Sequence, residues 1–254
     1  MILKNALREY TENFRVAISF GLLLLFVPVL LLEFFQSQNI FFSSGTFFAE
    51  YALVSPIVLV PEIVLVVFFF VLYALFVSLM VFGVRKNLSK VRVEYYLREM
   101  VKKFSTKIFI FFLASGLLMF TLSLILISVL DPATSALIAS LVLLIISLAL
   151  LFVPQAIVVD EVGVLDAVRE SFDFIKKYPG SFFRVVMTGT VLVALVLLIE
   201  FALDFLVLDF LPGRFVSAFL LLVFVVPFLE AMKTYVYMLK FDLVRKSEQA
   251  NNAR

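Results

Sequence analysis

The sequence predicts an all-α integral membrane protein with six transmembrane helices, and two observations carry that prediction. The 254-residue chain is 64% hydrophobic and has a mean hydropathy of +1.15, whereas soluble domains are roughly 45–50% apolar. A chain this apolar lacks the polar side chains needed to cover a water-exposed surface. Its Lys and Arg residues also alternate between connecting segments, as expected for a chain that crosses a membrane six times.

The expected spans are the stretches long and apolar enough to cross a hydrocarbon core, which takes about 20 helical residues. They cover residues 16–35, 56–84, 108–130, 135–159, 185–207 and 215–239. Pro28, Pro154 and Pro227 fall inside spans, where proline is expected to kink a membrane helix rather than end it. No small-residue cleavage site follows the first span, so we expect it to be retained rather than removed as a signal peptide.

The basic residues predict the orientation. Every Lys and Arg except Arg214 lies in residues 1–15, 85–107, 155–184 or 233–254. The alternate connections, 36–55, 131–134 and 208–214, hold only that one arginine. Because basic residues accumulate in cytoplasmic connections, we expect a multi-pass protein of the cell membrane with both the N and C termini in the cytoplasm.

Three short amphipathic segments lie on the basic side, at residues 3–14, 93–104 and 164–175. Each has apolar residues at positions i, i+4 and i+11 and an Arg-Glu pair at i+5 and i+6. Each is too short and too charged to span, so we expect interfacial helices whose basic residues face anionic lipid headgroups. The basic residues assigned to this role are Arg98, Lys102, Lys103, Arg169, Lys176 and Lys177.

The order interfacial helix, outward span, returning span thus occurs three times. This predicts a threefold repeat, with units at about 1–84, 85–159 and 160–246, inside a single membrane domain covering 1–254 and ending in a disordered tail at 247–254. Internal repeats are common in transporters. The alternative is that short basic amphipathic connectors look alike by chance, and the sequence alone leaves both interpretations open.

The third unit carries a resemblance. Pro154 is followed by an apolar run, Asp160, a helix with Ala167 and Arg169, and then Ser171-Phe172. Near the end the chain reads Phe241-Asp242-Leu243, then Arg245-Lys246, with Lys240 where an aromatic residue is usual. These stretches resemble the membrane domain of glycerophosphoryl diester phosphodiesterases and related uncharacterised six-span families of bacteria and archaea. The resemblance covers residues 151–184 and 235–246, and the remainder only by span count.

That resemblance implies an architecture rather than an activity. In those phosphodiesterases catalysis belongs to a separate soluble barrel domain whose active site uses His, and this chain contains no His and no Cys. The usual zinc sites and thiol nucleophiles are therefore excluded. The sequence also has no glycine-rich phosphate loop, no Gly-x-Ser-x-Gly and no His-Glu-x-x-His. We expect a protein that is not an enzyme, with no metal, no cofactor and no nucleic-acid partner; an intramembrane enzyme using carboxylates alone is the remaining exception.

Ionisable residues within membrane spans are costly and are candidates for function. Glu62, Glu200 and Asp204 lie towards the outer face, where they either form an acidic vestibule for cations and cationic amphiphiles or are ordinary carboxylates at the water interface. Glu230 and Lys233 follow Pro227 in the sixth span at an i, i+3 spacing. They either pair within the helix or line a cavity at a broken helix, as in transporters.

Two functions fit these patterns. The leading hypothesis is a non-enzymatic protein that handles or transports a lipid or another amphiphile within the helical bundle, with membrane lipids as its partners. The alternative is a structural scaffold that assembles with itself or with another membrane protein or enzyme component.

Overall fold

The computed structural model describes residues 2–35, 56–89, 97–129, 132–207 and 210–241. It is 94% helical, and the described residues contain no strand. The α-helices are α1 (Ile2–Glu12), α2 (Phe14–Phe35), α4 (Pro56–Leu88), α5 (Leu97–Met100), α6 (Thr106–Val129), α7 (Pro132–Ala149), α8 (Val153–Val159), α9 (Val164–Lys177), α10 (Pro179–Val207), α11 (Phe210–Leu220) and α12 (Val226–Met238). Two π-helical turns, η1 (Val101–Ser105) and η2 (Leu221–Val225), and one 3₁₀ turn, η3 (Leu239–Phe241), complete the described elements.

The predicted class, an all-α multi-pass membrane protein, is confirmed. Five helical segments are long and apolar enough to cross a bilayer: 63–88, 98–122, 137–159, 179–206 and 213–238. A sixth span is obtained when α1 and the first part of α2 are counted together, and these two helices meet at an angle of 74°. The first predicted span therefore corresponds to α2, with the amphipathic α1 turned away from it.

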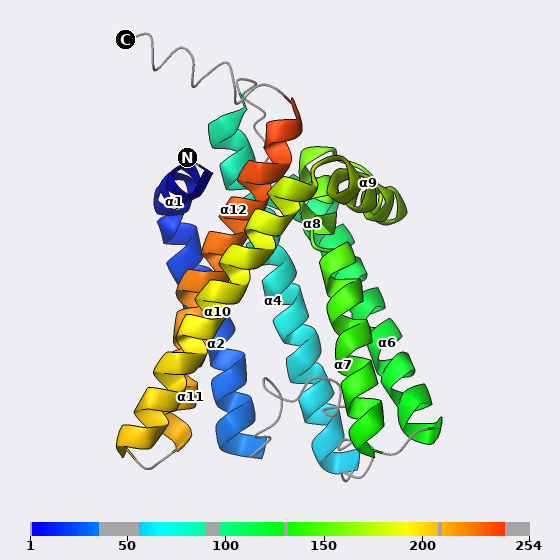
Figure 1. Ribbon diagram of the computed structural model, residues 1–254, viewed down its shortest axis with the longest axis vertical. Helices are drawn as coiled ribbons and strands as arrows, with labels where there is room; N and C mark the ends of the chain where they lie inside the picture. The colour runs from blue at the N-terminus through cyan, green and yellow to red at the C-terminus, as the bar shows by residue number, and fades with distance from the viewer. Residues whose placement is uncertain (1, 36–55, 90–96, 130–131, 208–209, 242–254) are drawn as a thin grey trace.

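The helices converge at one end of the bundle and diverge towards the other (Figure 1). We call the end that holds α1, α8, α9 and the last turns of α12 the polar end. From it, α6 and α7 run together as one arm and α10 and α11 as another, while α2 and α4 descend between them (Figure 1).

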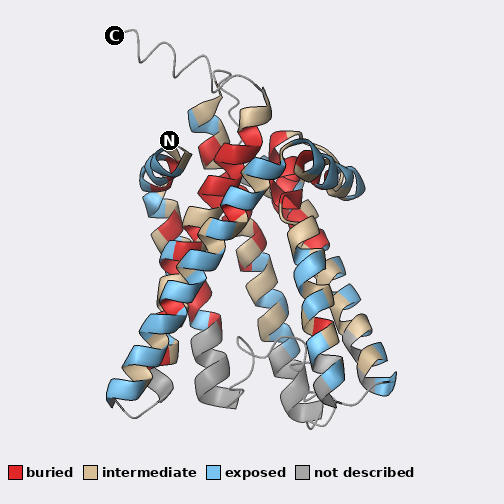
Figure 2. Cartoon of the chain, in the orientation of Figure 1, coloured by how far each residue is buried: buried red, intermediate tan, exposed pale blue. Residues whose placement is uncertain are grey.

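Burial follows the same direction. Figure 2 shows the buried positions gathered at the polar end and exposed ones along the arms. In the 213–238 span, which contains α12, 44% of an 18-residue apolar stretch is buried inside the molecule. In the α10 span, only 11% of such a stretch is buried. Every residue from Phe152 to Val159 is buried. The core of the molecule is thus the polar end rather than the middle of the bundle.

Helix α4 passes from one environment to the other along its length. Its polar-end half is buried at Phe76, Met80 and Val84. Its other half exposes Val64 and Phe68, at 61% and 45%. The same helix is therefore a central core element at one end and an exposed apolar surface at the other.

Two of the spans are interrupted, the fourth close to the polar end and the sixth near its middle. In the fourth, α7 ends at Ala149 and α8 starts at Val153, with Pro154 in its first turn. In the sixth, η2 precedes α12, whose first turn holds Pro227. Proline cannot donate a helical hydrogen bond and crowds the preceding turn, which accounts for irregular backbone beside both prolines.

The predicted interfacial segments have different outcomes. The first forms α1, and the third forms α9, which ends before Tyr178. The second lies partly outside the described residues, and its described part runs through α5 and η1 directly into α6. The three units therefore differ in how the leading helix joins its span, and the threefold repeat stays a prediction. The predicted tail, 247–254, lies outside the described residues.

Candidate functional site

A group of buried polar side chains lies between α8 and α12. Glu230, only 3% exposed, accepts hydrogen bonds from Lys233 Nζ at 2.5 Å and from Gln155 Nε2 at 2.9 Å. Gln155 is completely buried, and its Oε1 atom has no hydrogen-bond partner among the described residues. We call Gln155, Glu230 and Lys233 the buried triad. It joins the fourth span to the sixth by hydrogen bonds.

The triad is formed by helical spacing within α12 and by the packing of α8 on α12. Glu230 and Lys233 are three residues apart, so they share one face of α12. Thr234 Oγ1 donates to the Glu230 carbonyl oxygen at 2.8 Å on the same stretch of helix. Gln155 is the one polar side chain of α8, and it reaches Glu230 because α8 packs against α12. A carboxylate in this apolar setting is stabilised because both oxygens receive donors, one of them charged.

A second polar group forms where α8 ends. Lys240 Nζ donates to Asp160 Oδ2 at 2.7 Å, and Tyr237 Oη donates to the same oxygen. The Lys240 ammonium also lies 3.6 Å from the Glu170 carboxylate and 4.1 Å from the centroid of the Tyr237 ring. These contacts tie the last turns of α12 and η3 to the segment that joins α8 to α9.

The neighbouring residue, Glu161, has a backbone φ of 59°, in the left-handed region that non-glycine residues seldom adopt. Its carboxylate forms an ion pair with Arg85 at 3.0 Å and a second with Lys103. Arg85 Nη1 also donates to the Val158 carbonyl oxygen at 2.5 Å. Such a backbone costs about 1–3 kcal/mol, and the two ion pairs supply a reason for the chain to hold it.

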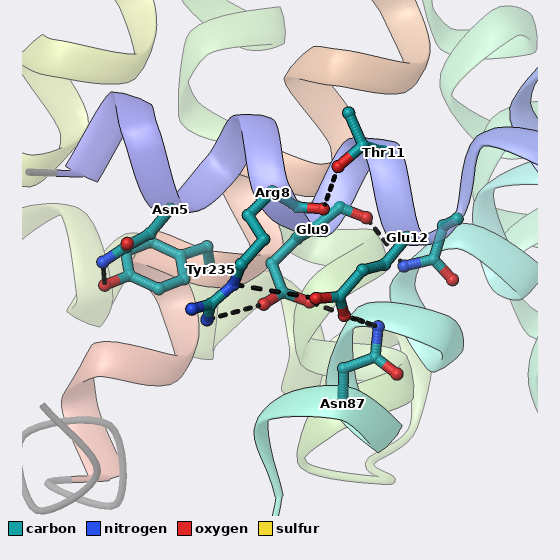
Figure 3. A network of polar contacts seen from close by, with 8 residues as sticks. Asn5, Arg8, Glu9, Thr11, Glu12, Asn87 and Tyr235 are labelled. Carbon is teal, nitrogen blue, oxygen red and sulfur yellow. Dashed lines mark hydrogen bonds and ion pairs between the residues drawn. The ribbon is translucent and has the colours of Figure 1, made fainter. Parts of the chain in front are cut away.

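Helix α1 is attached to the polar end by a third group of contacts (Figure 3). Asn5 Nδ2 donates to Tyr235 Oη on α12 at 2.8 Å. Glu9, only 1% exposed, accepts from Asn87 Nδ2 on α4 at 3.3 Å and pairs with Arg8 at 3.4 Å. Burial raises the pKa of the Glu9 carboxyl above its ordinary value, while the hydrogen bond from Asn87 acts in the opposite direction.

The acidic and basic residues that were predicted within the spans do not form one site. Glu230 and Lys233 form the intrahelical pair that one interpretation predicted. Glu200 and Asp204 lie one turn apart on α10, each with a shielded carboxylate oxygen that has no hydrogen-bond partner among the described residues. The structure does not bring these two together with the buried triad. Glu62 falls in α4, and its side chain lies outside the described residues.

The basic residues expected to face headgroups also separate into two classes. Five of them are exposed, in α5, η1 and α9: Arg98, Lys102, Arg169, Lys176 and Lys177. The sixth, Lys103, is engaged in the ion pair with Glu161. A basic residue that was expected to face lipid headgroups is thus an internal partner of Glu161.

The sequence predicted no structural role for Gln155, Ser171 or Tyr237, although Ser171 belongs to the motif that carries the resemblance. Gln155 had a usable signal, since it is a single amide inside the apolar run of α8 and unpaired polar groups in a membrane are costly. The other two had none, because their partners, Ala149 and Asp160, are 22 and 77 positions away.

This arrangement holds helices together through neutralised pairs of charges. Among the residues that the structure describes, no three His, Cys, Asp or Glu side chains are grouped so that they could hold a metal ion. No protein-family model matches the chain, and comparison with curated proteins and with solved structures gives no match. The resemblance to the phosphodiesterase membrane domain therefore stays a prediction.

Proposed function

We propose that this protein handles lipids or other amphiphiles, holding an apolar chain against the exposed half of α4 while the polar end keeps the helices in place. The observation that carries the proposal is the change along α4. Its buried half anchors the bundle, and its other half presents Val64, Val67, Phe68 and Val71 as one exposed apolar face. Exposed apolar side chains in a bilayer are covered by acyl chains or by another protein.

The divergence of the two arms supports an acyl chain as the ligand. The helices are joined by ion pairs and hydrogen bonds at the polar end, and they separate towards the other end (Figure 1). A bundle that is fixed at one end and spread at the other offers apolar surface on a central helix as well as on its perimeter. The proposal requires that a lipid on α4, which packs against α2 and α6, exchanges with the bulk lipid more slowly than a lipid on the perimeter of the bundle.

The orientation belongs to the same proposal. We place the polar end on the cytoplasmic side of the cell membrane, because the basic residues lie in the connections at that end. The exposed half of α4 then lies in the outer leaflet.

One observation favours the second function, a membrane scaffold. Helix α10 is exposed along most of its length, including Leu198 and Phe201 at 64% and 72%. A long apolar helix side of this kind suits packing against a second copy of the chain or against a transmembrane helix of another protein.

The two functions are separated by lipid exchange. The chain has no Trp, so Phe68→Trp on α4 and Phe201→Trp on α10 each introduce a single fluorophore in place of an exposed aromatic residue. Both variants are reconstituted with brominated lipid, which quenches Trp, and are then mixed with an excess of unbrominated vesicles.

Lipid handling predicts that fluorescence recovers quickly at position 201 and slowly, or incompletely, at position 68. Equal and fast recovery at both positions overturns lipid handling. Weak initial quenching at position 201, together with a dimer in solution, supports the scaffold instead.

A further inference from the structure

Helix α9 has three faces of different chemistry. Its inner face is buried at Ala167, Ser171 and Phe174. At 100° per residue, an outer stripe contains Leu165, Arg169, Phe172 and Lys176, all of which are exposed. Leu165 is 80% exposed. Apolar and basic side chains therefore alternate along a single line on the outside of this helix.

The third face lies beside that stripe and is mainly acidic, with Lys177 at its edge. Asp166 and Asp173 are exposed and project about 80–100° around the helix from Leu165. Around its circumference, α9 therefore changes from a buried face to a stripe of apolar and basic side chains, and then to a mainly acidic face. This is the order expected for a helix that lies in a membrane surface with its acids directed to water.

The position of α9 agrees with that order. The helix projects sideways from the bundle at the polar end, beside the ends of α7 and α10 (Figure 1). Both α7 and α10 run from the level of α9 towards the other end of the bundle. Helix α9 therefore lies at the level where these two apolar spans end (Figure 1).

The rotation of α9 about its own axis is fixed by contacts with the interrupted fourth span. Ser171 Oγ donates to the Ala149 carbonyl oxygen at 2.9 Å and accepts from the Phe152 backbone N–H at 3.3 Å. The Phe174 ring lies 4.6 Å from that of Phe152 and 4.9 Å from that of Tyr237, between centroids. These contacts hold the inner face inward, and so they hold the outer stripe outward.

We propose that the outer stripe of α9 docks on an anionic lipid surface, with Leu165 and Phe172 inserted below the headgroups and Arg169 and Lys176 paired with phosphate groups. Charge complementarity identifies the partner, because exposed apolar residues alone fit any bilayer, whereas interleaved cations favour a negative one. This docking is independent of the lipid-handling proposal, since it uses the membrane surface and a different helix.

The test uses Trp fluorescence of the full chain in nanodiscs. Phe172→Trp reports from the stripe and Asp173→Trp from the acidic face of the same helix. The nanodiscs contain phosphatidylcholine alone or phosphatidylcholine with phosphatidylglycerol. With the anionic lipid we expect the emission of Phe172→Trp to shift to the blue and its quenching by aqueous acrylamide to fall, while Asp173→Trp stays accessible.

Charge-matched variants identify the contact. In the Phe172→Trp background, Arg169→Gln with Lys176→Gln is expected to abolish the response to anionic lipid. Lys86→Gln with Lys177→Gln removes the same charge from exposed positions off the stripe, and the response is expected to persist. Emission from Phe172→Trp that stays unshifted and accessible to acrylamide in the anionic nanodiscs overturns the proposal. So does an equal response in phosphatidylcholine alone, or an equal loss of the response in both double variants.

Discussion

The two ends of this bundle are built from the same helices and are held by different forces. At the polar end, side chains from α4, α8, α12, η3 and the connection between α8 and α9 interlock through buried and half-buried ion pairs and hydrogen bonds. Away from it, apolar side chains on α10 and the far half of α4 are exposed. Since no hydrophobic force drives helices together within lipid, specific polar contacts and close backbone packing determine where this bundle closes.

The largest expected effect comes from breaking the buried triad. Glu230→Ala leaves the Lys233 ammonium and the Gln155 amide without their acceptor in a buried site. Removing one partner of a buried ion pair costs about 3–5 kcal/mol, so we expect a loss of that order in the free energy of unfolding, measured by titration with SDS. The control, Glu230→Met with Lys233→Met, removes both charges and is expected to lose much less. Similar losses in both variants contradict a charge-specific role.

The next effect tests the joint between α9 and the interrupted span. Ser171→Ala removes the donor to the Ala149 carbonyl and the acceptor for the Phe152 N–H. Each buried group left without a partner costs about 1–3 kcal/mol. We expect a clear fall in the unfolding midpoint, and faster amide exchange at Phe152. Ser171→Thr keeps the hydroxyl and is the matched control. Unchanged exchange at Phe152 in the alanine variant contradicts this role.

Close backbone packing is tested at Gly21. A Cβ atom there comes within 2.9 Å of the Leu222 carbonyl oxygen and of Val223 Cα in η2. Backbone atoms move less readily than side chains, so Gly21→Ala is expected to lose about 1–3 kcal/mol of stability by overpacking. Gly180→Ala, where nothing lies within 4 Å of the new methyl group, is expected to be neutral or slightly stabilising. Equal melting temperatures for the two variants contradict the close approach of α2 to η2.

A smaller effect concerns pH and α1. Because burial raises the pKa of Glu9 in the folded protein above the ordinary value of 4.5, the protonated form is favoured by folding. The stability this group contributes is therefore complete below its unfolded pKa and is lost as pH rises through its folded pKa. We expect amide exchange in α1 to become faster over that rise. Glu9→Gln is expected to remove this dependence of the α1 exchange rate on pH. A wild-type exchange rate that does not change over the same pH range contradicts the prediction.

The smallest effect belongs to the exposed arm. Leu198→Ala on α10 removes a side chain that is 64% exposed, and it is expected to change stability by no more than about 0.5 kcal/mol. Ile157→Ala, in the fully buried α8, is the contrasting core variant and is expected to cost about 2–5 kcal/mol. A large loss of stability in Leu198→Ala, measured on a monomeric sample, contradicts the difference between the exposed arm and the buried polar end.

The spans were predictable because they depend on local composition. Residues 185–207 were expected to form the fifth span, and α10 covers them but begins earlier, at Pro179. Hydropathy detects the apolar part of a helix, whereas the helix itself continues through polar residues at its ends. The amphipathic pattern of residues 3–14 likewise predicted a separate helix, and α1 turns 74° from α2.

The polar layer was predictable only where both partners are near in sequence. The pairing of Glu230 with Lys233 was one of the two interpretations that the sequence allowed, because helical geometry places i and i+3 together. The contact of Gln155 with Glu230 joins residues 75 positions apart, and it depends on how α8 packs against α12. Composition gives no information about that packing, so the partner of Gln155 could not be predicted even though a single amide in an apolar run is a signal, and Lys103 was assigned to lipid instead of to Glu161.

The attachment of α1 to α12 also sets an order of events during synthesis. Asn5 and Tyr235 are 230 positions apart, so α1 waits for α12 before this contact forms. At ribosomal rates of about 5–20 residues per second, that wait lasts roughly ten seconds to under a minute. During it, the face of α1 that carries Tyr10, whose ring packs edge-on against Phe228, has no α12 to pack against. The polar end is therefore completed only after α12 has been made, and a chain that stops before α12 leaves α1 without this partner.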